Sequence, residues 1–109
     1  MKPICIIPAR GGSKGVPKKN IRKIDGKPLI AYTIKSALKS KIFSHVFVCT
    51  EDSDIARISK NFGAEVPFLR PKKLAGGSVP MDAVLVDFIN KIISLDYKFD
   101  TFVWRDCTV

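Results

Sequence analysis

Short apolar segments alternate with longer amphipathic ones along the whole chain, and this alternation most constrains the fold. Ile4 to Ile7 form a continuous apolar run, which is typical of a strand covered on both faces. Val46 to Thr50 are rich in β-branched residues and predict a second buried strand. Thr101 to Trp104 predict a last strand, and Glu65 to Leu69 predict a short extended segment between the two.

Amphipathic segments separate these strands and predict three helices. The first is expected over residues 28–40, because Pro28 stands where a helix can begin. The second is expected after a cap at Asp52 or Ser53 and before Gly63, and the third after Ser78. Their apolar faces are Ile30, Ile34 and Leu38 in the first helix, Ile55, Ile58 and Phe62 in the second, and Met81, Leu85, Phe88, Ile89 and Ile92 in the third.

The order of these elements predicts an α/β fold with three layers, in which helices cover both faces of a mostly parallel sheet. The chain has 109 residues, which suits one domain with a modest core, and we expect residues 1–109 to form a single nucleotide-binding domain. The chain stops five residues after its last predicted strand. We therefore expect it to be the incomplete, N-terminal part of a larger domain, or a shortened form.

A glycine-rich basic segment follows the first strand. Three glycines and four cations lie between Arg10 and Lys19. Glycine lets a backbone approach a ligand closely, and amide groups beside Lys and Arg suit a polyphosphate. The segment fits neither the Walker pattern nor the dinucleotide fingerprint Gly-x-Gly-x-x-Gly. A P-loop NTPase and a Rossmann dehydrogenase are therefore disfavoured, while a loop after a strand remains where open α/β sheets bind ligands.

The charge of the chain is concentrated in and after this segment. Residues 1–41 hold eleven Lys or Arg and one acid, whereas residues 42–109 hold eight cations and nine acids. A local excess of positive charge attracts anionic ligands. Tyr32 is the only aromatic residue between Arg10 and Lys41. Nucleic-acid binders usually interleave aromatic residues with basic ones, so the sequence favours a small polyphosphate and predicts no nucleic-acid partner.

Cysteine content and hydropathy indicate the cellular compartment in which the protein is expected. Cys5, Cys49 and Cys107 fit no zinc pattern, and we interpret them as small apolar residues in a reducing compartment. No apolar run approaches the ~20 residues of a membrane helix. The first strand follows Met-Lys-Pro too closely for a secretory signal. We therefore expect a cytoplasmic protein without a membrane partner.

Several motifs resemble the start of the acylneuraminate cytidylyltransferases, the CMP-sialic acid synthetases. The resemblance covers about residues 4 to 100 and implies the fold of nucleotide-diphospho-sugar transferases, which is Rossmann-like. It also implies a reaction in which the anomeric hydroxyl of a nonulosonic acid attacks the α-phosphorus of CTP. The motifs are Ile7-Pro8-Ala9-Arg10-Gly11-Gly12-Ser13-Lys14-Gly15, Pro17-Lys18-Lys19-Asn20-Ile21, Gly26-Lys27-Pro28-Leu29-Ile30, Val48-Cys49-Thr50-Glu51-Asp52 and Phe62-Gly63-Ala64-Glu65-Val66-Pro67.

The resemblance also implies roles for individual residues. Arg10 and Lys19 are the catalytic candidates and should hold the triphosphate. Asn20 should contact the nucleotide, and Arg70 should help to form the base and ribose pocket. The full set of implied nucleotide-binding residues is Ala9, Arg10, Gly11, Gly12, Ser13, Lys14, Lys19, Asn20, Arg70 and Arg105.

Three departures from the family pattern bear on the base and the metal. Arg105 stands where the family usually has a glutamine that helps to read cytosine, and arginine offers donors only. Met81 stands at a position that is usually small and polar. The family binds Mg²⁺ through an Asp-x-Asp pair expected beyond residue 109, which leaves Asp106 as a lone candidate ligand. The resemblance further implies a homodimer for the full-length form.

Two alternatives stay open at this point. One is an enzyme of the same fold that activates another sugar or alcohol with a different nucleoside triphosphate. The other is a module that binds a nucleotide or a nucleic acid without catalysis.

Overall fold

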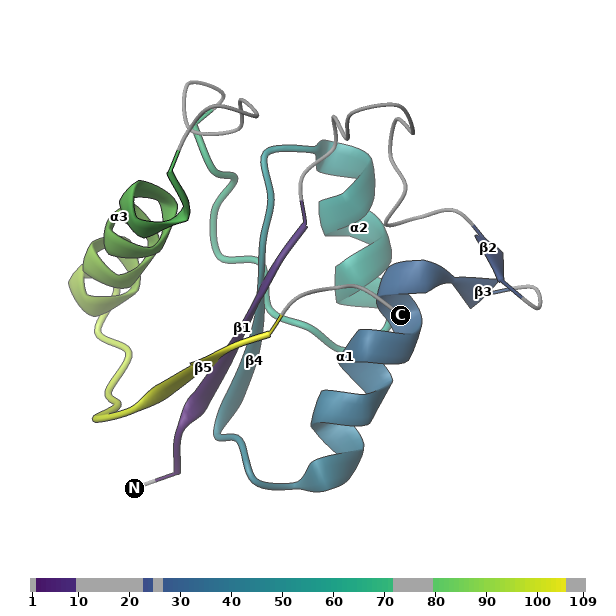
Figure 1. Ribbon diagram of the computed structural model, residues 1–109, viewed down its shortest axis with the longest axis horizontal. Coiled ribbons are helices and arrows are strands. Elements are labelled where there is room, and N and C mark those ends of the chain that lie inside the picture. The colour runs from purple at the N-terminus through teal and green to yellow at the C-terminus, as the bar shows by residue number, and fades with distance from the viewer. Residues whose placement is uncertain (1, 10–22, 25–26, 72–79, 106–109) are drawn as a thin grey trace.

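The computed structural model describes residues 2–9, 23–24, 27–71 and 80–105. Figure 1 shows a central sheet with α3 on one side and α1 and α2 on the other, which confirms the predicted three-layer α/β arrangement. The elements, in chain order, are β1 (Ile4–Pro8), β2 (Lys23–Ile24), β3 (Lys27–Pro28), α1 (Leu29–Ser40), β4 (His45–Cys49), α2 (Ser53–Asn61), α3 (Met81–Ser94) and β5 (Phe102–Trp104).

The main sheet has three described strands in the order β4-β1-β5, and both pairings are parallel. In the register, Ile4 lies beside His45 of β4 and beside Phe102 of β5. Glu65 adds an isolated parallel bridge to Phe47 on the outer side of β4. The predicted extended segment 65–69 therefore pairs with the sheet only at its first residue.

Each strand sends alternate side chains to opposite faces of the sheet, as pleating requires. One core cluster lies between the sheet and the helices α1 and α2, and the other lies under α3. The first contains Cys5, Ile7, Ala9, Val46 and Val48 from the sheet with Ile30, Ile34, Ala37, Ile55 and Ala56 from the helices. The second contains Ile4, Ile6, Phe47 and Cys49 from the sheet with Val84, Phe88 and Ile92 from α3.

The structure differs from the sequence prediction beside α1. A two-stranded antiparallel ribbon, β2-β3, precedes the helix, and Pro28 belongs to β3 rather than to the first turn of α1. Leu38 has helical spacing with Ile30 and Ile34, but it is 42 % exposed while they are buried. Leu38 lies close to the turn after α2, where a Cβ at Gly63 would be 2.9 Å from its Cδ1. At the end of α1, Leu38 therefore faces the turn after α2, while its neighbour Ala37 is buried in the cluster against the sheet.

None of the described helices is long and apolar enough to cross a membrane.

Candidate functional site

The carboxyl ends of β1, β4 and β5 meet at one edge of the sheet. Ala9 follows β1, Thr50 follows β4 and Arg105 follows β5. Along the chain, the sheet is built outward from β1 through β4 and the Glu65 bridge, and β5 is then added on the other side of β1. The strand order therefore reverses between β1 and β5. Open α/β sheets bind ligands at such a switch point, outside the carboxyl ends of their strands.

The carbonyl oxygen of Cys49 joins three segments at this edge. It accepts a hydrogen bond of 2.9 Å from the backbone N–H of Ala9 and another of 2.9 Å from Nη2 of Arg70. The backbone N–H of Arg70 donates to the carbonyl oxygen of Thr50 at 2.7 Å. Ala9 and Arg70 therefore share one hydrogen-bond acceptor. Ala9 precedes the glycine-rich segment, and Arg70 is a predicted pocket residue.

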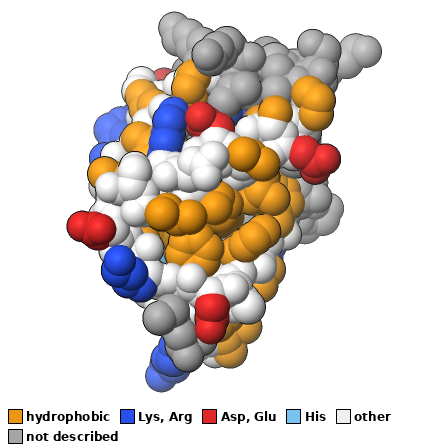
Figure 2. All heavy atoms as spheres, turned by 90° about the vertical axis from the view of Figure 1, so that its left-hand side faces the viewer, with side chains coloured by type: hydrophobic (Ala, Val, Ile, Leu, Met, Phe, Trp, Pro, Cys, Tyr) orange, Lys and Arg blue, Asp and Glu red, His pale blue; other side chains and the backbone are white. Residues whose placement is uncertain are grey.

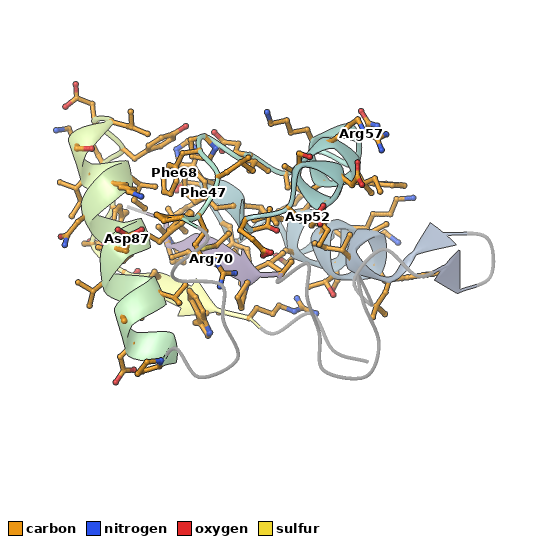
Figure 3. The ribbon with its side chains drawn as sticks, turned by 90° about the horizontal axis from the view of Figure 1, so that it is seen from above. Phe47, Asp52, Arg57, Phe68, Arg70 and Asp87 are labelled. Carbon is orange, nitrogen blue, oxygen red and sulfur yellow. The ribbon has the colours of Figure 1, made fainter. Side chains whose placement is uncertain are left out.

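Arg70 brings a positive charge to the interior of this edge. The residue is only 6 % exposed. Figure 3 shows the same edge from above, with Arg70 between Asp87 of α3 and Asp52, the residue before α2. Burial raises the pKa of the Cys49 thiol to about 11, and the nearby Arg70 guanidinium partly opposes this shift. A buried cation with a fixed orientation suits an edge that binds an anion.

The start of α2 also lies at this edge, and nearby side chains accept hydrogen bonds from its backbone N–H groups. Oγ1 of Thr50 accepts a hydrogen bond from the N–H of Asp52 at 3.1 Å. The Asp52 carboxylate accepts from the N–H groups of Asp54 at 2.8 Å and Ile55 at 3.1 Å, as predicted for an N-cap. These two N–H groups therefore already donate hydrogen bonds within the chain and are not available to bind a phosphate.

Arg105 closes the β5 side of the edge. Its backbone N–H donates to the carbonyl oxygen of Ile6 at 2.9 Å, which extends the β1-β5 pairing. Its Nη2 donates to Oγ of Ser36 on α1 at 3.1 Å. The same guanidinium opposes the rise of the pKa of Cys5, which burial brings to about 11. The side chain of this predicted nucleotide-binding residue therefore extends along the α1 face of the sheet.

The structure thus brings Ala9, Arg70 and Arg105 together at the predicted edge. The other predicted residues lie outside the described part of the chain, and their roles stay predictions. They are Arg10, Gly11, Gly12, Ser13, Lys14, Lys19, Asn20 and Asp106, and the side chain of Met81 is likewise not described.

The metal prediction is not tested by the structure, because Asp106 lies outside the described residues. They contain no group of three or more His, Cys, Asp or Glu side chains that could hold a metal ion.

Sequence reasoning missed the parts of the site that depend on distant contacts. The roles of the Cys49 carbonyl and of Ser36 have no local signal, because their partners lie 21 and 69 residues away in the chain. Thr50 could have been noticed, since a threonine two residues before an Asp helix cap can accept a hydrogen bond from the backbone of that cap.

A second polar cluster lies at the opposite, amino edge of the sheet. Glu65 lies 2.6 Å from Nδ1 of His45 and accepts a hydrogen bond of 3.2 Å from the hydroxyl of Tyr97. Burial, with the nearby Glu65 carboxylate, raises the pKa of Tyr97. The His45 ring packs edge-on against Tyr97 and stacks on Phe47. These contacts join β4, the Glu65 bridge and the segment after α3, and they give the amino edge a structural role.

Comparison with protein families and with curated proteins gives consistent matches. The model of a family described as cytidylyltransferase matches residues 4–95. A pseudaminic acid cytidylyltransferase of Campylobacter jejuni subsp. jejuni serotype O:2 is 43 % identical over 100 residues, which is 92 % of this chain and 43 % of that protein. A CMP-N,N'-diacetyllegionaminic acid synthase of Legionella pneumophila is 40 % identical over 93 % of this chain and 44 % of its own length.

An N-acylneuraminate cytidylyltransferase of Escherichia coli O18:K1:H7 is also 40 % identical, over 93 % of this chain and 23 % of its own length. The chain therefore spans less than half of the length of these relatives. Among solved structures, a CMP:2-keto-3-deoxy-manno-octonic acid synthetase complexed with CTP superposes with a TM-score of 0.79 and 24 % identity. The superposition covers 98 % of this chain and 40 % of that one, and it supports the same fold.

Proposed function

Because this chain belongs to the cytidylyltransferase family, we propose that the protein transfers a cytidylyl group from CTP to a nonulosonic acid. In this reaction a sugar hydroxyl oxygen bonds to the α-phosphorus of CTP. The bond from that phosphorus to the bridging oxygen breaks, pyrophosphate leaves, and the hydroxyl proton is lost. The products are a CMP-sugar and pyrophosphate. Three relatives named for pseudaminic, legionaminic and acylneuraminic acids support this class of acceptor.

One observation carries the assignment of the nucleotide to this chain. Ala9, whose amide donates to the Cys49 carbonyl, follows the central strand at the carboxyl edge beside the switch point. The glycine-rich basic segment begins at the next residue, Arg10. We assign the triphosphate to this segment, with Arg10 and Lys19 neutralising charge and the amides of Gly11 and Gly12 donating. Phosphoryl transfer depends mainly on such positioning and charge neutralisation.

Arg70 supports the neighbouring part of the proposed site. Its guanidinium is buried and donates to the Cys49 carbonyl, so it fixes the end of β4 while it contributes positive charge. We assign the nucleoside to the part of the carboxyl edge between Arg70 and the end of β5. Arg105 stands where the family usually has a base-reading glutamine, and its side chain lies on the α1 face beside Ser36. Selectivity for the base therefore has to be measured.

Three further assignments belong to the whole protein. We propose Mg²⁺ as the cofactor, with its main ligands beyond residue 109. We propose a homodimer for the full-length form. We also propose a cytoplasmic location, because CTP is the second substrate and the described cysteines, Cys5 and Cys49, are free and buried.

Isothermal titration calorimetry with CTP, UTP, ATP and GTP tests the nucleotide assignment on the chain itself. We expect CTP to bind most tightly and Lys19→Met to weaken its binding about tenfold or more, because one phosphate contact is lost. Lys39→Met is the matched control, since Lys39 carries the same charge but lies in the last turn of α1 at the amino edge. Equal heats for all four nucleotides, or equal effects of both substitutions, would refute the assignment.

A turnover assay tests the reaction. Pyrophosphate release is measured on full-length protein with CTP, Mg²⁺ and, in separate reactions, pseudaminic, legionaminic and N-acetylneuraminic acids. We expect release to depend on one of these acids. Release with none of them, from a protein that binds CTP in the calorimeter, would rule out this class of acceptor.

A further inference from the structure

Helix α3 carries a pair of opposite charges on the flank that faces the segment after the Glu65 bridge. Asp87 and Lys91 lie four positions apart, and Nζ of Lys91 is 3.1 Å from Oδ2 of Asp87. The same ammonium group lies 5.1 Å from the ring centre of Phe68, which belongs to that segment. Two contacts therefore hold Lys91, and Lys91 in turn holds the Asp87 carboxylate on this flank.

Helix α3 runs antiparallel to the segment that it flanks. From the Glu65 bridge the segment runs parallel to β4, and at its end the N–H of Arg70 donates to the carbonyl oxygen of Thr50. Tyr97, which follows α3, contacts Glu65 at the amino edge. Helix α3 therefore begins near the carboxyl edge and ends near the amino edge (Figure 1).

This direction places Asp87 on the side of Arg70. Lys91 lies beside Phe68, and Asp87 is four helical residues, about 6 Å, closer to the carboxyl edge. Arg70 is also closer to that edge than Phe68. Arg70 is buried and Phe68 is half-buried, whereas Leu69 between them is exposed, so both of these side chains point inward. In Figure 3, Arg70 accordingly lies next to the flank of α3 that carries Asp87.

The Cys49 thiol lies on the α3 face of the sheet and is influenced by both charges. Burial raises the pKa of this thiol to about 11, the Arg70 guanidinium opposes the rise, and the carboxylates of Asp87 and, less strongly, Glu51 add to it. A third acid at this edge, Asp52, is engaged in capping α2. Asp87 is therefore the acid on the α3 side that acts on the same buried group as Arg70.

We infer that Asp87 is a positioning residue of the nucleotide site, because its carboxylate balances the charge of Arg70 and sets how strongly this cation attracts an anionic ligand. A buried cation is costly unless an opposite charge compensates it. An anion at the carboxyl edge is attracted by Arg70 and repelled by Asp87, and Lys91 weakens that repulsion. The inference rests on the proposed nucleotide site for the identity of the ligand.

The surroundings of α3 favour such an effect. Figure 2 looks onto α3 and shows mostly hydrophobic side chains on this face, with charged side chains around them. The Asp87 side chain itself is only 29 % exposed. Charges beside apolar groups are screened less than charges in water, so they act over longer distances.

An ordinary ion pair on the surface of a helix is the competing interpretation. A pair at this spacing stabilises its own helix weakly and has no effect on a ligand elsewhere. The two interpretations differ in one respect, which is whether the effect of replacing Asp87 depends on the charge of Arg70.

Thermal unfolding without nucleotide tests this dependence. We expect Asp87→Asn to lower the melting temperature by about 4 °C or more, because Arg70 then stays buried without the charge that balances it. With Arg70→Gln already present, the same substitution should lower it by less than about 2 °C. Asp100→Asn is the matched control, since Asp100 is exposed and precedes β5 at the amino edge. Equal losses from Asp87→Asn in both backgrounds would overturn the inference.

Calorimetric titration with CTP tests the effect on the ligand and needs no Arg70 variant. Asp87→Asn should tighten CTP binding about threefold or more, because a negative charge beside the site is removed. Lys91→Met should weaken it about twofold or more, because the Asp87 charge is then no longer shared. Asp100→Asn and Lys98→Met make the same charge changes at exposed positions of the amino edge and should have little effect.

The two substitutions on α3 should therefore change CTP binding in opposite directions. An ordinary surface pair predicts instead that both lower the melting temperature slightly and that neither changes CTP binding more than its control. That result, or weaker CTP binding by Asp87→Asn, would overturn the inference. If the unsubstituted chain bound no nucleotide, the proposed function would fail, and the thermal comparison alone would decide whether Asp87 and Arg70 are coupled.

Discussion

Among single residues, Cys49 contributes through its backbone rather than its thiol. Its carbonyl oxygen accepts from Ala9 and from Arg70, and so it links the residue before the glycine-rich segment to a buried cation. Neither contact could be predicted from the sequence, because a backbone acceptor leaves no trace in residue type. Arg70 itself was predicted, but as a pocket residue and not as the side chain that fixes the end of β4.

The first prediction concerns Arg70. Replacing it with alanine should lower the free energy of unfolding by about 1–3 kcal/mol, because a charge-assisted hydrogen bond in the interior is lost. Arg57→Ala is the matched control, since the Arg57 side chain is 65 % exposed and its ion pair with Asp54 is 3.6 Å long. It should cost less than about 0.5 kcal/mol. Urea unfolding measures both, and equal losses would contradict the buried role of Arg70.

The second prediction concerns pH and the buried thiols. The pKa values of Cys5 and Cys49 are raised from 9.0 to about 11 in the folded protein by burial. The folded state therefore keeps these protons where the unfolded state loses them, and stability present below pH 9 is lost as the pH rises toward 11. Urea unfolding from pH 8 to pH 11 should show this decline, and the Cys5→Ala, Cys49→Ala double variant should decline less. Parallel curves for both proteins would disprove the assignment to the thiols.

At the scale of elements, local patterns gave correct predictions where they span several residues. The predicted strands and helices correspond to β1, β4, β5, α1, α2 and α3. They could be predicted because burial of one or both faces of an element produces a hydrophobic pattern in the sequence. The β2-β3 ribbon was missed because each strand has two residues, too few to show a period. Glu65 to Leu69 were expected to form a short extended segment, and only Glu65 pairs with the sheet.

Gly63 gives the prediction at this scale. It ends the turn after α2 with φ of +102°, a conformation that side chains other than glycine rarely adopt. Gly63→Ala should lower the free energy of unfolding by about 1–2 kcal/mol through backbone strain. The Leu38 Cδ1 atom, 2.9 Å from the new Cβ, belongs to a flexible side chain and can move away. Thermal unfolding is the measurement, and an unchanged midpoint would show that the turn tolerates a side chain.

At the scale of the whole molecule, the two edges of the described sheet hold different sets of polar contacts. The amino edge is joined by the cluster of His45, Glu65 and Tyr97. The carboxyl edge carries Ala9, the Cys49 carbonyl and Arg70 beside the switch point. The sequence could predict that the strands are parallel, and the carboxyl edge as the ligand edge stays a prediction. It could not predict the order β4-β1-β5, because strand order is set by tertiary packing between distant segments.

Backbone chemical shifts of the isotope-labelled chain, recorded during a titration with CTP, test the central claim most directly. The account predicts that the amide signals of Ala9, Thr50 and Arg70 move in a saturable manner. Those of His45, Glu65 and Tyr97, at the amino edge, should stay in place. Saturable shifts confined to the amino edge, or no shifts at any of these amides with CTP in large excess, would contradict the assignment of the nucleotide site.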